Sequence, residues 1–297
     1  MTLTTKQRSL TPLNRSSSVT SRRNPSAPSM VSPVPANAVT FFDDFYSSII
    51  TNVGFGSGTI ATPDTLTNIA PLGGPTWTAT EFAGTAGTTN ITAGANAFTG
   101  TGTVSLTTGN GSGDSIGIDL GGVTAGGVPA FYLSQTLPSN GLWRVQVPSG
   151  LTTQDFGVGW VTTGITCATD WLTDPDTTLL AGLAVVFTKH VASYSGDAAG
   201  DLVCRIYDAG SVFDTSFVVL AAASLAVATA YKLEIGCDGT SLLVYLNGAQ
   251  VGAAVTLTGL AGTTQLRPTA RVKNTTAAVR VFSLDCYYQE LGQATAR

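Results

Sequence analysis

From about residue 36 onward, the chain consists of short apolar runs separated by Gly, Asn, Asp and Pro. No segment keeps a 3.6-residue apolar period over three turns, so the pattern predicts an all-β protein. The stretch 47–113 is looser and rich in Gly and Thr, and we expect long loops there. The predicted strands before the C-terminal region are 39–45, 76–82, 103–107, 115–120, 130–133, 141–147, 156–162, 182–187, 202–207 and 216–221.

The C-terminal region has the clearest pattern. Three apolar runs, 231–237, 241–246 and 249–251, are separated by Asp-Gly at 238–239 and Asn-Gly at 247–248. These dipeptides tolerate the positive φ angles of tight hairpin turns, so the three runs are predicted to form an antiparallel meander. A last pair of strands, 266–273 and 278–288, follows, and the second is expected to return beside the first strand of the body.

The same region carries a family resemblance. The run YKLEIGCDGTSLLVYLNGAQVG at 231–252, followed by LRPTARVKNTTAAVRVFSLDCYYQE at 266–290, resembles the concanavalin A-like lectin/glucanase group, which includes laminin-G-like domains. Asp285 matches the acidic residue of that group's final strand, and FFDDF at 41–45 looks like its first strand. The resemblance implies an antiparallel two-sheet jelly-roll sandwich spanning residues 41–297, although 47–131 lacks a convincing match.

Charge divides the chain into a cationic arm and an anionic body. Residues 1–40 contain five of the fourteen basic residues and none of the eighteen acidic ones. This segment is rich in Pro and Ser and buries too little apolar surface to fold alone, so it is predicted to be an extended arm. The basic residues of the arm, which we take as its anchoring residues, are Lys6, Arg8, Arg15, Arg22 and Arg23.

The motifs of hydrolytic enzymes are missing or out of context. Retaining glucanases of the resembled group carry three carboxylates on one strand as E-x-D-x-x-E, whereas the three glutamates here, Glu81, Glu234 and Glu290, stand alone. The sequence GDSIG at 113–117 fits G-x-S-x-G, but no helix pattern follows it. His190 is predicted to lie at a strand end or in a loop. We therefore expect no catalytic residues and no enzyme activity.

Two groups of residues are candidates for ligand binding. Asp170, Asp174 and Asp176 supply the oxygen ligands that calcium prefers, although Asp and Pro also build turns, and the turn is the favoured interpretation. Trp77 and Trp171 are candidate glycan contacts, whereas Trp143 and Trp160 alternate with apolar strand positions and are predicted to be core.

The remaining composition predicts no cofactor and no membrane segment. The apolar runs are too short to span a bilayer, and the glycine-rich stretches lack the G-K-[ST] ending of a phosphate loop. Cys167, Cys204, Cys237 and Cys286 are scattered and are predicted to be free, buried thiols.

The arm and the charge-poor body together suggest a virion structural protein, most simply a bacteriophage capsid decoration or cement protein on the outer capsid surface. The arm is expected to bind the major capsid protein or another virion protein by strand addition, and the body to form a homotrimer or homodimer. Nucleic-acid binding by the arm is the less favoured reading, because no aromatic residue precedes Phe41. The alternative function is a head or tail fibre protein whose lectin-like body recognises host glycans.

Overall fold

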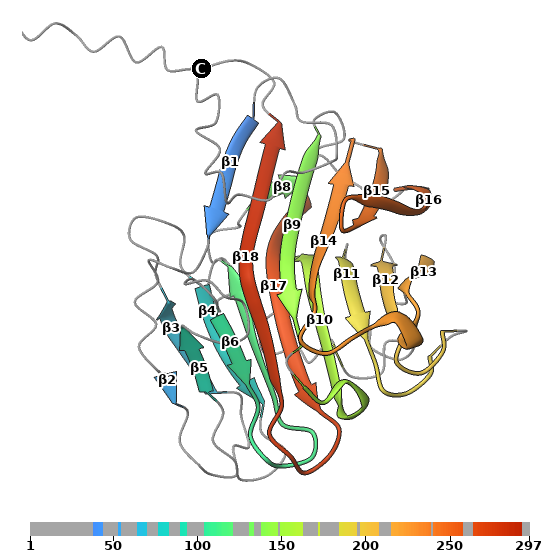
Figure 1. Ribbon diagram of the computed structural model, residues 1–297. Coiled ribbons are helices and arrows are strands. Elements are labelled where there is room, and N and C mark those ends of the chain that lie inside the picture. Colours follow the sequence, from blue (N-terminus) through green and yellow to red (C-terminus); the bar gives the residue numbers. More distant parts are fainter. Residues whose placement is uncertain are drawn as a thin grey trace, which may run out of the picture.

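The computed structural model describes strands throughout the body, two short 3-10 turns at Leu151–Thr153 and Ala222–Ser224, and no α-helix among the described residues (Figure 1). None of these residues belongs to a helix that is long and apolar enough to cross a membrane. Of the strands before residue 104, the backbone alone is described. The described residues are 38–43, 53–54, 64–69, 77–82, 90–93, 104–120, 131–133, 138–147, 149–162, 172, 184–194, 197–207, 215–238, 240–257 and 264–292.

The described strands form two antiparallel sheets of nine strands each, which confirms the predicted two-sheet jelly-roll sandwich. Sheet A has the order β16-β15-β14-β9-β18-β6-β5-β2, with β1 also beside β18. Its strands are β1 (Ala38–Asp43), β2 (Val53–Gly54), β5 (Asn90–Ala93), β6 (Val104–Thr107), β9 (Ser139–Gln146), β14 (Ala230–Cys237), β15 (Ser241–Leu246), β16 (Ala249–Thr256) and β18 (Val281–Gly292).

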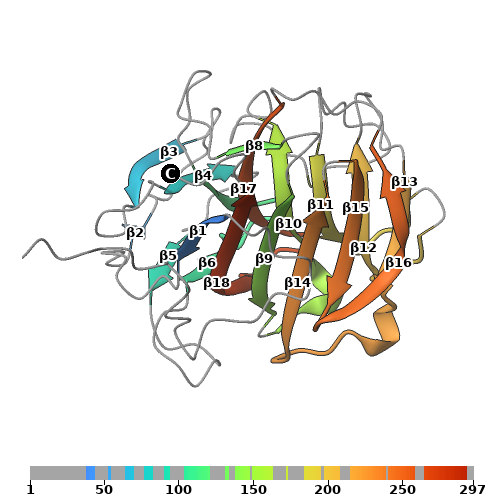
Figure 2. The same cartoon turned by 90° about the horizontal axis from the view of Figure 1, so that it is seen from above.

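Sheet B has the order β13-β12-β11-β10-β17-β7-β4-β3, with β8 also beside β17. Figure 2 views the two layers from above and shows β13 and β16 at the same side of the sandwich. The strands of sheet B are β3 (Asp64–Ile69), β4 (Trp77–Phe82), β7 (Ser115–Leu120), β8 (Phe131–Leu133), β10 (Gln154–Thr162), β11 (Ala184–Lys189), β12 (Leu202–Tyr207), β13 (Thr215–Leu220) and β17 (Thr264–Asn274).

The long strand β18 joins the two ends of the body. Its second half pairs with β1, from Ala38 opposite Gly292 to Asp43 opposite Tyr287. This pairing confirms the prediction that the last strand returns beside the first. Because β1 begins at Ala38, sheet A starts three residues before Phe41, the predicted first residue of the body.

The last two strands do not pair with each other, so their prediction as a strand pair is wrong. Strand β17 lies in sheet B and β18 in sheet A, and the turn after β17 carries the chain from one layer to the other. Asn274 fixes this crossing, because its side-chain amide donates to the carbonyl oxygens of Gly109 and Ala278 at 2.9 and 3.1 Å. Non-local burial therefore overrides the hairpin that the short turn suggests.

The predicted meander is confirmed as β14, β15 and β16. Asn247 and Gly248 have φ angles of 51° and 87°, as the tight turn between β15 and β16 requires. At the preceding turn, Asp238 accepts hydrogen bonds from the backbone N–H groups of Thr240 and Ser241, and these bonds lower the pKa of its carboxyl group. Local turn chemistry thus sets the register of all three strands.

An aromatic cluster fills the space between the sheets. Trp143 of sheet A and Trp160 of sheet B are 1% and 0% exposed, which confirms both as core residues. Their rings pack edge to face with centroids 5.9 Å apart, and Trp160 Nε1 donates to the hydroxyl of Tyr287 at 3.3 Å. A Cβ atom at Gly141 would lie 2.5 Å from Trp160, so this position has no space for a side chain.

Candidate functional site

Most of the sequence-predicted site residues lie outside the described part of the chain. Trp77 is the first residue of β4 and pairs with Leu120, but its side chain is not among those described. The described residues contain no group of three or more His, Cys, Asp or Glu side chains that could hold a metal ion. The predicted residues outside the described ranges are Lys6, Arg8, Arg15, Arg22, Arg23, Asp170, Trp171, Asp174 and Asp176.

The G-x-S-x-G sequence and His190 do not form a hydrolase site. Ser115 begins β7 and is fully buried, so it does not stand on a strand-to-helix elbow. His190 follows β11, as predicted, and is 4% exposed. Strands β17 and β10 separate β7 from β11, which places the two residues roughly 14 Å apart, since neighbouring strands are spaced by about 4.8 Å.

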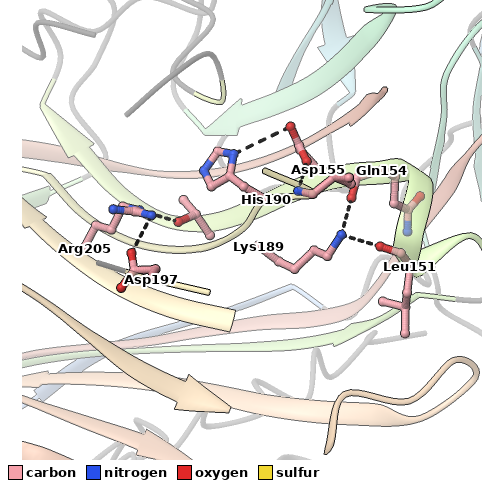
Figure 3. Close-up of polar contacts among 9 residues, drawn as sticks. Leu151, Gln154, Asp155, Lys189, His190, Asp197 and Arg205 are labelled. Atoms are coloured by element: carbon pink, nitrogen blue, oxygen red, sulfur yellow. Dashed lines mark hydrogen bonds and ion pairs between the residues drawn. The ribbon is translucent and has the colours of Figure 1, made fainter. Parts of the chain in front are cut away.

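His190 instead belongs to a closed polar cluster at the ends of β10 and β11 (Figure 3). Its Nδ1 lies 3.6 Å from Oδ2 of Asp155, whose other oxygen accepts a hydrogen bond from Val191 N at 2.6 Å. Next to them, Arg205 contacts Asp197 at 2.7 Å and donates to Thr188 Oγ1 at 3.1 Å. These bonds tie the β11–β12 connection to the strands on either side of it.

Lys189 lies in the same cluster and donates to the carbonyl oxygens of Leu151 and Gln154 (Figure 3). Its side chain is withdrawn from water, and this burial lowers its pKa from 10.5 to about 8, partly offset by the negative charge of Asp155. The cluster is thus an internal clamp, because its groups bind one another and the backbone while exposing almost no surface to a ligand.

The arginines on the outward face of sheet B are buried in the same way. Arg205, Arg267 and Arg271 all point away from the core, yet they are only 1 to 4% exposed. Arg271 is paired with Gly117 on one side and Gly157 on the other, so its side chain lies between two positions without side chains. These three arginines are therefore not accessible to a ligand, whereas Lys273 near the end of β17 is half-buried.

The outward face of sheet A is partly open and carries the candidate site. Arg144 of β9 forms an ion pair with Asp285 of β18, and their side chains are 39% and 17% exposed. The pair exists because β18 has a bulge between Leu284 and Cys286, which leaves Asp285 without a cross-strand partner and turns it toward Arg144. Lys232 of β14 lies directly opposite Arg144 and is half-buried.

A second row of side chains crosses the same face. Glu234 of β14 stands between Tyr245 of β15 and Leu142 of β9, and Tyr288 of β18 lies opposite Leu142. Burial, and then the charge of Glu234, raise the pKa of the Tyr245 hydroxyl. We name these residues the sheet A polar patch: Arg144, Lys232, Glu234, Tyr245, Asp285 and Tyr288.

The polar patch combines four half-buried residues, Arg144, Lys232, Asp285 and Tyr288, with Glu234 and Tyr245, which are only 2% and 7% exposed. Two cations stand beside two anions, so the patch is balanced in charge. Such a surface can donate and accept hydrogen bonds together and can pack aromatic rings against an apolar face of a ligand. It holds no arrangement of metal ligands.

The alternation of core and outward residues along the strands could have predicted three of the six residues of this patch. In β9 and β14, Arg144, Lys232 and Glu234 alternate with core residues, so an outward position could have been assigned from the sequence. The pairing of Arg144 with Asp285 could not, because 141 residues separate them and a bulge decides the geometry.

Neither a protein-family model nor a curated protein sequence matches the chain. Solved structures do match in fold. Peanut lectin has a TM-score of 0.50 at 10% identity, with 88% of this chain and 100% of the lectin covered. A laminarinase from Flavobacterium sp. UMI-01 has a TM-score of 0.41 at 11% identity, covering 65% of this chain and 79% of the enzyme, and the alginate lyase AlyC3 has 0.42 at 10%, covering 65% and 76%.

The fold is that of the concanavalin A-like lectins and glucanases. This confirms the fold implied by the sequence resemblance.

One prediction is corrected by the same comparison. The expectation that the chain is not an enzyme is contradicted, because the solved structures that match include a laminarinase and an alginate lyase. It rested on the missing E-x-D-x-x-E motif and on a G-x-S-x-G sequence that no helix pattern follows, and these concern only two catalytic mechanisms. Enzymes and binding proteins share this fold, so the fold does not exclude catalysis.

Proposed function

We propose that the body recognises carbohydrate and that the sheet A polar patch is its binding surface. The observation that carries the proposal is the Arg144–Asp285 ion pair, which is held on the partly open face of a lectin-like sandwich beside Lys232 and the Glu234–Tyr245 pair. On the other sheet, the arginines Arg205, Arg267 and Arg271 are almost fully buried. Ligand access therefore favours sheet A.

The chemistry of the patch suits a sugar with several hydroxyl groups. Each hydroxyl both donates and accepts a hydrogen bond, and the patch offers guanidinium and ammonium donors next to carboxylate acceptors. Tyr288, which is half-buried, adds a phenol ring against which the C–H face of a sugar ring can pack. Because Arg144 and Lys232 are balanced by Asp285 and Glu234, a neutral glycan fits better than a polyanion.

A glycan array followed by calorimetry tests the proposal. The full chain is expected to bind a neutral glycan, and Arg144→Gln or Asp285→Asn is expected to weaken binding by about tenfold or more, since a hydrogen bond to a charged group contributes about 1.5–3 kcal/mol. Lys273→Gln is the control, because it makes a similar change on the outward side of sheet B. Lack of binding to any glycan, or unchanged affinity in both patch variants, would refute the proposal.

We further propose that residues 1–40 anchor the body to the outer surface of a virion, as a capsid decoration or fibre protein does. The supporting observation is the charge of this segment, which carries five cations and no anion ahead of an acidic body. Deleting residues 1–37, which removes all five basic residues and leaves β1 complete, is expected to abolish co-sedimentation with particles while glycan binding persists. If the truncated chain still decorates particles at full occupancy, the anchoring proposal is wrong, and the glycan proposal is unaffected.

A further inference from the structure

Two described stretches on one side of the sandwich contain no charged residue. They are residues 215–230, which comprise β13 and the segment after it, and β16 at 249–256. The first Lys or Arg after Asp214 is Lys232, and no charged residue lies between Asp238 and Arg267. Figure 2 shows β13 and β16 next to each other, so the two stretches form one surface, which we name the uncharged edge.

The uncharged edge is exposed and apolar. Among the described residues, the large hydrophobic side chains that are exposed are Val218, Val227 and Val279, at 42%, 50% and 50%, and the first two belong to this edge. Around them, residues 221–224, 226–229, 249–250 and 252–254 are exposed and consist mainly of Ala, Val and Gly. Soluble monomers normally place charge on such a surface.

Both edge strands are bulged. In β13, Val219 is left over between the pairs Leu202–Leu220 and Val203–Val218, and in β16 residues 252–254 stand opposite the single residue Leu243. The bulge in β16 folds onto β13, because a Cβ atom at Gly252 would lie 3.0 Å from the ring of Phe217. Such bulges interrupt the backbone ladder and prevent open-ended strand addition, so a partner at this edge is held by side chains.

We infer that the uncharged edge is the contact between two copies of this chain. Outside residues 1–40, the chain carries nine basic and eighteen acidic residues, so copies repel through most of their surface. The uncharged edge lets two bodies meet without placing like charges together. A two-fold axis brings the same surface of each copy into contact with itself. An uncharged surface can make such a contact because the two identical surfaces do not repel each other.

The size and rim of the edge fit this contact. A stable interface takes about 20–30 residues from each partner, and the two stretches together are of that size. Charged residues stand at its border: Asp201 accepts a hydrogen bond from the backbone N–H of Ala222. In the sequence, Asp214 directly precedes the first residue of the edge, and Lys232 follows residue 230 by two positions. An apolar centre with a polar rim is the usual anatomy of a protein interface.

Sedimentation of the full chain over a concentration series tests the inference. The wild-type chain is expected to form a dimer that resists salt, because an uncharged contact is not screened. Val218→Lys and Val227→Lys are each expected to raise the dissociation constant by roughly a hundredfold, since like charges facing each other cost several kcal/mol. Val279→Lys is the matched control, because Val279 is as exposed as Val227 but lies in the β17–β18 turn.

Circular dichroism checks that each variant folds, and both valines are exposed enough to accept a lysine. Hydrogen exchange gives a second measurement, in which 215–230 and 249–256 become more protected as concentration rises. A wild-type chain that stays monomeric at all concentrations overturns the inference. The inference is also overturned by an oligomer that persists in both edge variants. An oligomer that dissociates at high salt overturns it too, because an ionic contact made by the arm would behave in this way.

Discussion

Replacing Lys189 with Met tests the closed cluster at the ends of β10 and β11. The lysine is 2% exposed, and burial lowers its pKa from 10.5 to about 8. Between these two pH values the unfolded chain binds the proton that the folded chain has lost. The contribution of Lys189 to stability therefore rises as the pH increases from 8 to 10.5, and Lys189→Met removes this rise.

The size of the effect follows from the difference between the two pKa values. Each tenfold difference in proton affinity corresponds to about 1.4 kcal/mol, so the gain over this pH range is at most about 3.5 kcal/mol. Water that reaches the ammonium group would reduce the gain, but its two carbonyl partners, Leu151 and Gln154, hold the group inside the cluster.

Urea denaturation of both proteins at pH 7, 8, 9 and 10 measures the effect. The free energy of unfolding of the wild type, minus that of Lys189→Met, is expected to increase steadily above pH 8. Subtracting the variant removes the contributions of tyrosines, cysteines and other lysines, which both proteins share. Lys232→Met, a half-buried lysine on sheet A, shows what the loss of another lysine does. A difference that stays constant or falls with pH would refute the reasoning.

Three further predictions concern the core and the backbone. Gly141→Ala is expected to lower the free energy of unfolding by about 1–3 kcal/mol, because its Cβ would lie 2.5 Å from Trp160; urea denaturation followed by tryptophan fluorescence measures this. Ala228→Gly is expected to stabilise the protein by a few tenths of a kcal/mol up to about 1 kcal/mol in a melting experiment, because Ala228 has a φ angle of 55° that favours glycine. Cys204 is expected to resist iodoacetamide at pH 8 until the protein unfolds, since burial raises the pKa of its thiol; peptide mass spectrometry checks it.

Much of the fold could be predicted because its signals are local. The strands from Ser115 to Leu120 and from Leu202 to Tyr207 begin and end where the apolar pattern does. The Asn247–Gly248 turn also lies where its dipeptide predicts it. By contrast, β3 and β5 fall in the Gly- and Thr-rich stretch that was expected to form loops, because sequences of such weak alternation become strands only when neighbouring strands pair with them.

The candidate site was less accessible to prediction. The sequence directed attention to Trp77, Trp171 and the aspartates of the 170s, whereas the described structure presents a patch around Arg144 and Asp285. Arg144 is an ordinary charged position in a strand, and Asp285 stood out only as the acidic residue of the resembled group's final strand, not as the partner of Arg144. Only the bulge in β18 brings them into contact.

The amino-acid sequence alone determined the β class of the body, its charge division at the arm, and the position of most strands, because alternation and turn residues act over a few neighbouring positions. The tertiary structure decided which strands lie side by side. It placed β17 and β18 in opposite sheets, buried three arginines on the outward side of sheet B, and joined residues 215–230 to 249–256 as one uncharged edge. These outcomes depend on the total burial of residues far apart in the chain, which no local pattern encodes.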